Sequence, residues 1–182
     1  MITELTELIN YSENKTRVLV YSTLPEISKF LLEILDFNGK KADYFSAEES
    51  RTHDQDFILF QTSDLQEASL FQPNIALITD EISKEDVREL MKNIVAGGVL
   101  IFPQFMADTV GSALHYFRKL PFEKADFKSE NGTALLDTEI GPIPINTSSE
   151  NLINQLNGLK LLVQQFGVME EGFYEPVMGI FG

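Results

Sequence analysis

Strand-like apolar runs and amphipathic segments of helical periodicity alternate between residues 17 and 102. The run at 17–21 reads RVLVY, a continuous apolar stretch that is typical of a strand buried on both faces of a sheet. Further strands are predicted at 42–46, 56–61, 74–79 and 99–102. Because strands and helical segments alternate, the sequence predicts an α/β fold with a mostly parallel, helix-covered sheet.

Helix boundaries in this first part of the chain have recognisable signals. Thr23 and Glu26 have the spacing of a capping box, which predicts a helix start at Thr23. Gly39 is expected to end that helix. Ser83 precedes Asp86 at the same spacing, so a second capped helix is predicted, running through Val95.

The pattern changes after Pro121, where short strand-like segments follow one another without helices between them. These segments are predicted as strands at 122–127, 133–137 and 139–145. Tight connections between them are typical of antiparallel pairing. The sequence therefore predicts a small antiparallel extension of the fold over 122–145.

Both ends of the chain are expected to be helical. Residues 1–16 are predicted as an N-terminal arm or helix, and Ser148 or Ser149 is expected to cap a long helix near the other end. A final short helix is predicted at 170–179. With no internal repeat or low-complexity segment, residues 1–182 are expected to form a single domain.

The charge balance excludes several classes of partner. The chain has 28 acidic residues against 14 lysines and arginines, which gives a formal net charge of -14. Such a surface repels phosphate backbones and anionic lipids, so neither nucleic acid nor a membrane is expected as a partner. The absence of cysteine excludes disulfides and thiolate chemistry. No signal peptide is expected, and the composition fits a cytoplasmic protein.

The turn after the first predicted strand lies where an α/β protein would bind a phosphate group. A phosphate-binding loop needs glycines, whose backbone N–H groups curl around the anion, and a lysine. Residues 21–26 read YSTLPE and contain neither, while Pro25 removes one N–H and Glu26 adds a negative charge. This turn is therefore expected to repel a triphosphate. Ser22 and Thr23 either cap the helix or hold a small neutral ligand.

Residues that bind metals or catalyse hydrolysis are not found in a convincing arrangement. His53 is expected in a solvated loop and His115 half-buried in a helix, far apart in the sequence. Asp80 and Glu81 follow a predicted strand and either bind a divalent cation or form the acidic start of the next helix. The second interpretation is preferred, so no metal and no catalytic residue is predicted.

Three asparagines form a row near the end of the chain. Asn151, Asn154 and Asn157 lie three residues apart on one edge of the predicted helix. Asparagine is uncommon inside helices because its side chain competes for backbone hydrogen bonds. The row indicates either amide contacts to a ligand or a buried link between the helix and the sheet, with solvent exposure as a third alternative.

Four strings resemble the central, ATP-binding domain of the Mur ligases, cytoplasmic enzymes that add amino acids or peptides to UDP-N-acetylmuramate. They are FLLEILDFNGKK at 30–41, QPNIALIT at 72–79, AGGVLIF at 96–102, and the ending at 161–182 with FGVMEEGFY and IFG. The branch that attaches recycled murein tripeptide is the most similar. The resemblance covers residues 17–182 and ends with the central domain, so neither companion domain is expected.

Most functional positions of that family are not matched. Its phosphate loop falls on residues 21–25, its magnesium-binding acid falls near Gln61, and its histidine falls on Lys84. The Gly-x-His-Asn-x-x-Asn motif of the family maps onto 148–154, where both asparagines are kept. The first of them contacts adenine in the family, so the resemblance implies a binding role for Asn151.

These observations favour a non-catalytic, degenerate Mur-ligase-like domain that acts as a binding or assembly module. No cofactor is expected, and cell-wall enzymes are the candidate protein partners. The alternative is a small-molecule binding protein that holds a neutral nucleoside or a sugar in the remnant crevice. The candidate ligand-binding residues are Ser22, Thr23, Asp80, Asn151 and Asn154.

Overall fold

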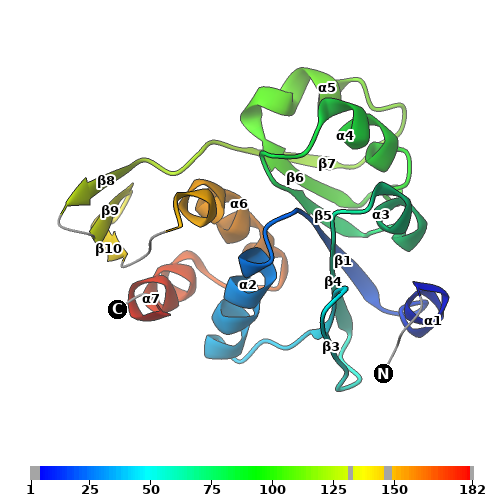
Figure 1. The fold of residues 1–182 in the computed structure, drawn as a ribbon, viewed down its shortest axis with the longest axis horizontal. Helices are drawn as coiled ribbons and strands as arrows, with labels where there is room; N and C mark the ends of the chain where they lie inside the picture. The colour runs from blue at the N-terminus through cyan, green and yellow to red at the C-terminus, as the bar shows by residue number, and fades with distance from the viewer. Residues whose placement is uncertain (1–4, 131–132, 146–148, 181–182) are drawn as a thin grey trace.

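A seven-stranded sheet lies at the centre of the molecule (Figure 1). The computed structural model describes residues 5–130, 133–145 and 149–180. In chain order the strands are β1 (Thr16–Tyr21), β2 (Asp43–Phe45), β3 (Ser50–Arg51), β4 (Phe57–Thr62), β5 (Ile75–Ile78), β6 (Val99–Pro103) and β7 (Arg118–Phe122). Their order across the sheet is β3-β2-β4-β1-β5-β6-β7. All neighbours are parallel except β2 and the edge strand β3, which confirms the predicted mostly parallel sheet.

Helices cover both faces of this sheet (Figure 1). They are α1 (Leu5–Tyr11), α2 (Glu26–Phe37), α3 (Leu65–Phe71), α4 (Lys84–Met91), α5 (Ala107–Gly111), α6 (Glu150–Gln165) and α7 (Glu170–Ile180), with a 3-10 turn η1 (Gln104–Met106) before α5. Helices α2, α6 and α7 pack on one face, and α1, α3, α4 and α5 pack on the other. Side chains of β1 alternate between the two cores: Val18 and Val20 face α2, whereas Leu19 and Tyr21 face α3 and α4.

A three-stranded antiparallel sheet lies beside α6 and α7 (Figure 1). Its strands are β8 (Phe127–Glu130), β9 (Thr133–Thr138) and β10 (Gly141–Ile145). The predicted antiparallel extension is therefore confirmed, but the strand expected at 122–127 is wrong. Phe122 instead ends β7, which pairs in parallel with β6, and residues 123–126 connect the two sheets.

The predicted helix caps have different outcomes. Ser83 and Ser149 cap α4 and α6, since their side chains accept hydrogen bonds from the backbone N–H groups of Asp86 and Leu152. Ser148, the alternative cap, lies outside the described residues. The capping box at Thr23 is wrong, because α2 begins at Glu26 after Pro25 and no side chain caps it. The Thr23 hydroxyl has another partner, described below.

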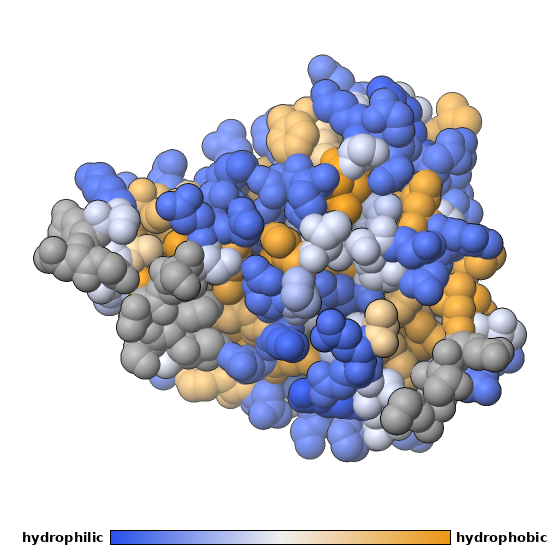
Figure 2. All heavy atoms as spheres, viewed as in Figure 1, coloured by the Kyte–Doolittle hydropathy of each residue, from blue (hydrophilic) through white to orange (hydrophobic). Residues whose placement is uncertain are grey.

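The surface is mainly polar on the face that Figure 2 shows, with apolar side chains visible in separate strips between polar ones. Within the described residues, no helix combines the length and the apolar character that crossing a membrane requires. This finding agrees with the sequence, whose apolar runs are a few residues long.

Candidate functional site

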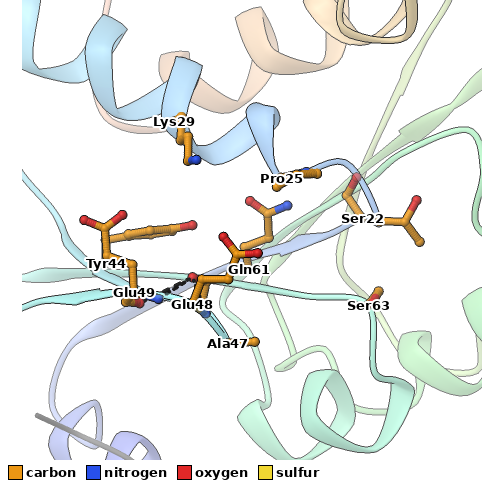
Figure 3. Close-up of a pocket in the computed structure, with 11 residues that line it drawn as sticks. Ser22, Pro25, Lys29, Tyr44, Ala47, Glu48, Glu49, Gln61 and Ser63 are labelled. Carbon is orange, nitrogen blue, oxygen red and sulfur yellow. Dashed lines mark hydrogen bonds between the residues drawn. The ribbon is translucent and has the colours of Figure 1, made fainter.

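A cavity of about 160 Å³ lies at the carboxyl ends of β1 and β4, below the first turns of α2 (Figure 3). In an open parallel sheet this edge is where ligands bind, because the connecting loops diverge there. The β1–α2 turn contributes Ser22 and Thr23, so two of the predicted binding residues line the cavity. The loop after β2, at 46–49, forms the opposite wall.

The β1–α2 turn is closed by a carboxylate from the loop after β5. One oxygen of Glu81, Oε1, accepts the Thr23 backbone N–H at 2.8 Å and the Ser22 hydroxyl at 2.7 Å. The same oxygen accepts the hydroxyl of Thr79 at 2.6 Å and that of Thr23 at 3.3 Å. A backbone N–H and three hydroxyls thus converge on an anion that belongs to the chain itself.

These hydrogen bonds change the roles that were predicted for Thr23 and for Glu81. Thr23 does not cap α2, because its N–H and its hydroxyl are both directed at Glu81. Glu81 was expected to be part of the acidic start of α4 or a cation ligand. Its partners are instead hydrogen-bond donors across the sheet edge. The sequence could not indicate this contact, because it depends on β5 lying next to β1.

Asp80 points away from this cavity although it precedes Glu81 in the chain. Its carboxylate accepts the side-chain amide of Gln155 in α6 at 2.6 Å and pairs with the ammonium of Lys124 at 2.7 Å. Gln155 is fully buried, and its Oε1 has no hydrogen-bond partner among the described residues. Asp80 therefore links the sheet edge to α6, and it does not line the cavity formed by Ser22 and Thr23.

The asparagine row on α6 does not form one site. Asn151 is exposed and Asn154 is half-buried, and neither side chain forms a hydrogen bond with another described residue. Asn157 donates a hydrogen bond to the backbone oxygen of Glu123 at 3.0 Å, which ties α6 to the segment after β7. Asn157 thus links the helix to a connecting segment through an exposed hydrogen bond, which is not the buried helix-to-sheet link considered for this row. Asn151 and Asn154 do not line the cavity.

Gln61 is a cavity residue that sequence reasoning did not select for binding. It ends the buried part of β4, is 7% exposed, and donates its side-chain amide to the backbone oxygen of Leu24 at 2.7 Å. Its Oε1 has no hydrogen-bond partner in the described part of the chain. A buried amide oxygen without a donor is uncommon in folded proteins, because leaving it unpaired costs about 1–3 kcal/mol.

Neither histidine lines this cavity. His53 lies in an exposed loop, as expected, and its backbone N–H donates to the buried carboxylate of Asp43. His115 is half-buried and contacts the backbone oxygen of Ile94 at 2.8 Å. The expectation that His115 lies in a helix is wrong, since α5 ends at Gly111. Among the described residues, no three histidine, cysteine or acidic side chains are grouped as a metal site requires.

Tyr21, the last residue of β1, lies directly behind the β1–α2 turn. It is 1% exposed, and its hydroxyl faces a carboxylate oxygen of Asp86 at 3.4 Å. Burial, with a smaller contribution from Asp86, raises the pKa of Tyr21 to about 12. This phenol therefore stays neutral through the physiological range.

Comparisons with known proteins identify the fold. No protein-family model and no curated protein sequence matches the chain. Among solved structures, MurF from Acinetobacter baumannii matches with a TM-score of 0.69 and 13% identity over 96% of this chain and 49% of that one. The UDP-N-acetylmuramate:L-alanyl-gamma-D-glutamyl-meso-diaminopimelate ligase from Neisseria meningitides matches with a TM-score of 0.67 and 9% identity over 96% of this chain and 69% of that one.

An FPGS–AMPPCP–folate complex is also similar, with a TM-score of 0.63 and 6% identity over 96% of this chain and 66% of that one. The chain thus has the ligase fold that these proteins share. More particularly, it has a Mur-ligase-like fold, which confirms the resemblance predicted from the sequence at the level of structure. The chain spans about half the length of the MurF structure.

Proposed function

We propose that this chain is a non-catalytic binding domain with a Mur-ligase-like fold. The observation that carries the proposal is the contact of Glu81 with the β1–α2 turn. Phosphoryl transfer depends on metal ions and cationic side chains that neutralise the charge on the phosphates. The turn provides a carboxylate instead, and residues 21–26 contain neither glycine nor lysine.

The electrostatic penalty for a triphosphate at this turn is large. A phosphate that accepts the Thr23 N–H would have to displace the Glu81 carboxylate or lie against it. At 4 Å, two like unit charges repel each other by about 4 kcal/mol at an effective dielectric constant of about 20. That energy corresponds to roughly a thousandfold loss of affinity.

Isothermal titration calorimetry with magnesium-ATP and with a non-hydrolysable analogue tests the proposal. We expect no binding up to millimolar nucleotide and no release of phosphate. Glu81→Gln removes the charge and keeps most of the shape, and Glu13→Gln, at an exposed position in a bend, is the matched control. Micromolar binding of magnesium-ATP by the wild-type chain, or its hydrolysis, would overturn the proposal.

The biological role within this proposal is binding or assembly beside the enzymes of peptidoglycan metabolism, in the cytoplasm. It is supported by the similarity of the fold to ligases of that pathway. Titration of the purified chain against purified Mur ligases from the same cells, followed by analytical ultracentrifugation, tests it. A complex that forms at micromolar concentration is the expected result, and independent sedimentation with every ligase would contradict it.

A second candidate function is a small-molecule binding protein that uses the remnant crevice for a neutral nucleoside or a sugar. The cavity below α2 favours it, since Ser22 and Thr23 line that cavity. A thermal-shift screen separates the two candidates, because a ligand that binds the folded state raises the midpoint of unfolding. A stabilising nucleoside or sugar would favour the second candidate over assembly.

A further inference from the structure

We propose that the cavity below α2 binds a small zwitterion, whose carboxylate meets Lys29 and whose ammonium group meets Glu48. The inference rests on the proposed binding role and names the chemistry of its ligand. This ligand is smaller than the neutral nucleoside or sugar of the second candidate function, and it has both a positive and a negative charge. Charge and volume lead to it separately.

Opposite charges line the cavity without neutralising each other. Lys29 extends into it from α2, and Glu48 lies on the facing loop (Figure 3). Neither side chain forms an ion pair with any residue in the described ranges. The neighbouring carboxylate, Glu49, is occupied by Arg51. One unpaired cation and one unpaired anion on opposite walls complement a ligand that has both charges.

Gln61 lines the cavity without offering an accessible acceptor. Its nitrogen is bonded to the backbone oxygen of Leu24, and its Oε1 is buried, out of contact with the open space of the cavity. Figure 3 shows the side chain between the β-strands and the first turn of α2, on the floor of the cavity. The charged contacts of the ligand therefore come from Lys29 and Glu48, and the three N–H donors of its ammonium group are directed at Glu48 and at solvent.

The volume limits the ligand to a compact molecule. A cavity of about 150 Å³ is known to hold a molecule the size of benzene, and this cavity measures about 160 Å³. A nucleoside, with roughly three times as many non-hydrogen atoms as benzene, could enter that space only in part. A triphosphate is excluded by charge as well, since Glu48 and Glu81 lie on both sides of the β1–α2 turn.

The experiment compares alanine, as the zwitterionic probe, with propionate and ethylamine, which each retain one of its charged groups. Binding is measured by NMR titration at pH 7 and low salt, following the backbone signals of residues 22–25 and 46–49. We expect alanine to bind at least tenfold more tightly than either single-charge probe, because it alone satisfies both walls. Equal affinity of all three probes, or no saturable shift with alanine up to 100-fold molar excess over about 1 mM protein, would overturn the proposal.

Variants of Lys29 and Glu48 test which charged group of alanine each side chain binds. Lys29→Gln is expected to weaken alanine at least tenfold and leave ethylamine unchanged, whereas Glu48→Gln should weaken alanine and leave propionate unchanged. Lys128→Gln on β8 and Glu13→Gln are the matched controls, both exposed and outside the cavity. Circular dichroism verifies that each variant is folded. Alanine binding that neither Lys29→Gln nor Glu48→Gln alters would also contradict the assignment.

The two proposals fail in different ways. Binding of magnesium-ATP would overturn the non-catalytic binding role whatever alanine does. Absence of alanine binding, together with absence of nucleotide binding, would overturn the zwitterion site alone and leave the proposed function in place.

Discussion

Glu81 is the residue whose loss should be most costly at the sheet edge. Glu81→Ala leaves the Thr23 N–H and the hydroxyls of Ser22 and Thr79 without their shared acceptor, and the last two residues are buried. We expect the free energy of unfolding to fall by about 1–3 kcal/mol. Urea denaturation measures it. Glu13→Ala, at an exposed position, should change it by less than about 0.5 kcal/mol. Equal effects of the two variants would contradict the role given to Glu81.

Because the pKa of Tyr21 is raised in the folded chain, the free energy of unfolding is expected to fall at alkaline pH. Its pKa is raised from 10.0 to about 12 in the folded chain, so the unfolded state loses the phenolic proton first. The contribution of this group to stability is expected to be complete below pH 10 and to be lost as pH rises through about 12, by about 1–3 kcal/mol in total. Tyr21→Phe should flatten this decline in denaturation measured from pH 9 to pH 12. Tyr116→Phe, at a position that is 74% exposed, should keep it. Parallel declines for wild type and Tyr21→Phe would contradict the prediction.

At the scale of single residues, the sequence showed which residue types are present at the site but not which residues they contact. The missing glycines and lysine could be recognised directly, and Ser22 and Thr23 do line the cavity. Asp80 and Glu81 were treated as one acidic pair. In the structure consecutive residues after β5 point to different sides, one toward α6 and the other toward the β1–α2 turn. No local pattern indicates which way each one turns.

At the scale of the elements, helix α6 packs closely against β7 at Gly158. A Cβ atom on Gly158 would lie 2.7 Å from the ring of Phe122, which is closer than packed atoms tolerate. Gly158→Ala is expected to lower the free energy of unfolding by about 1–3 kcal/mol, since the ring has to move. Thermal and urea denaturation measure the loss, and Phe122→Leu in the same background should recover part of it.

Gly179 provides the matched control for that substitution. It lies in α7, and a Cβ atom there would meet nothing within 4 Å. Gly179→Ala should therefore be neutral or stabilise the chain by up to about 1 kcal/mol, because alanine favours the helix. A similar loss for both variants would show that the contact with Phe122 does not determine the effect at Gly158.

Elements were predictable where burial dominates their sequence. β1, β5 and β6 are apolar almost throughout, and each was expected within a residue or two of its observed bounds. β7 reads RKLPF, with two cations and a proline, because it lies at the edge of the sheet with one side unpaired. β3 has two residues, too few for any alternation to be recognised.

For the whole molecule, the class of fold followed from the alternation of strands and helices, but the order of the strands did not. The sequence contains no signal that places β1 between β4 and β5. That placement brings Gln61 from β4 and Glu81 from beyond β5 to the two sides of one turn. The candidate site is therefore a property of the topology, which explains why residue patterns recovered only part of it.

The Glu81 carboxylate at the β1–α2 turn also limits which substitutions could create a nucleotide site there. Placing a lysine near residues 22–26 would create an internal ion pair with Glu81 before it attracted any nucleotide. Deleting Glu81 would leave unpaired donors and a weaker fold, and a proline would still interrupt the amides. No single one of these substitutions provides a phosphate site, so nucleotide binding at this turn would require several coordinated substitutions.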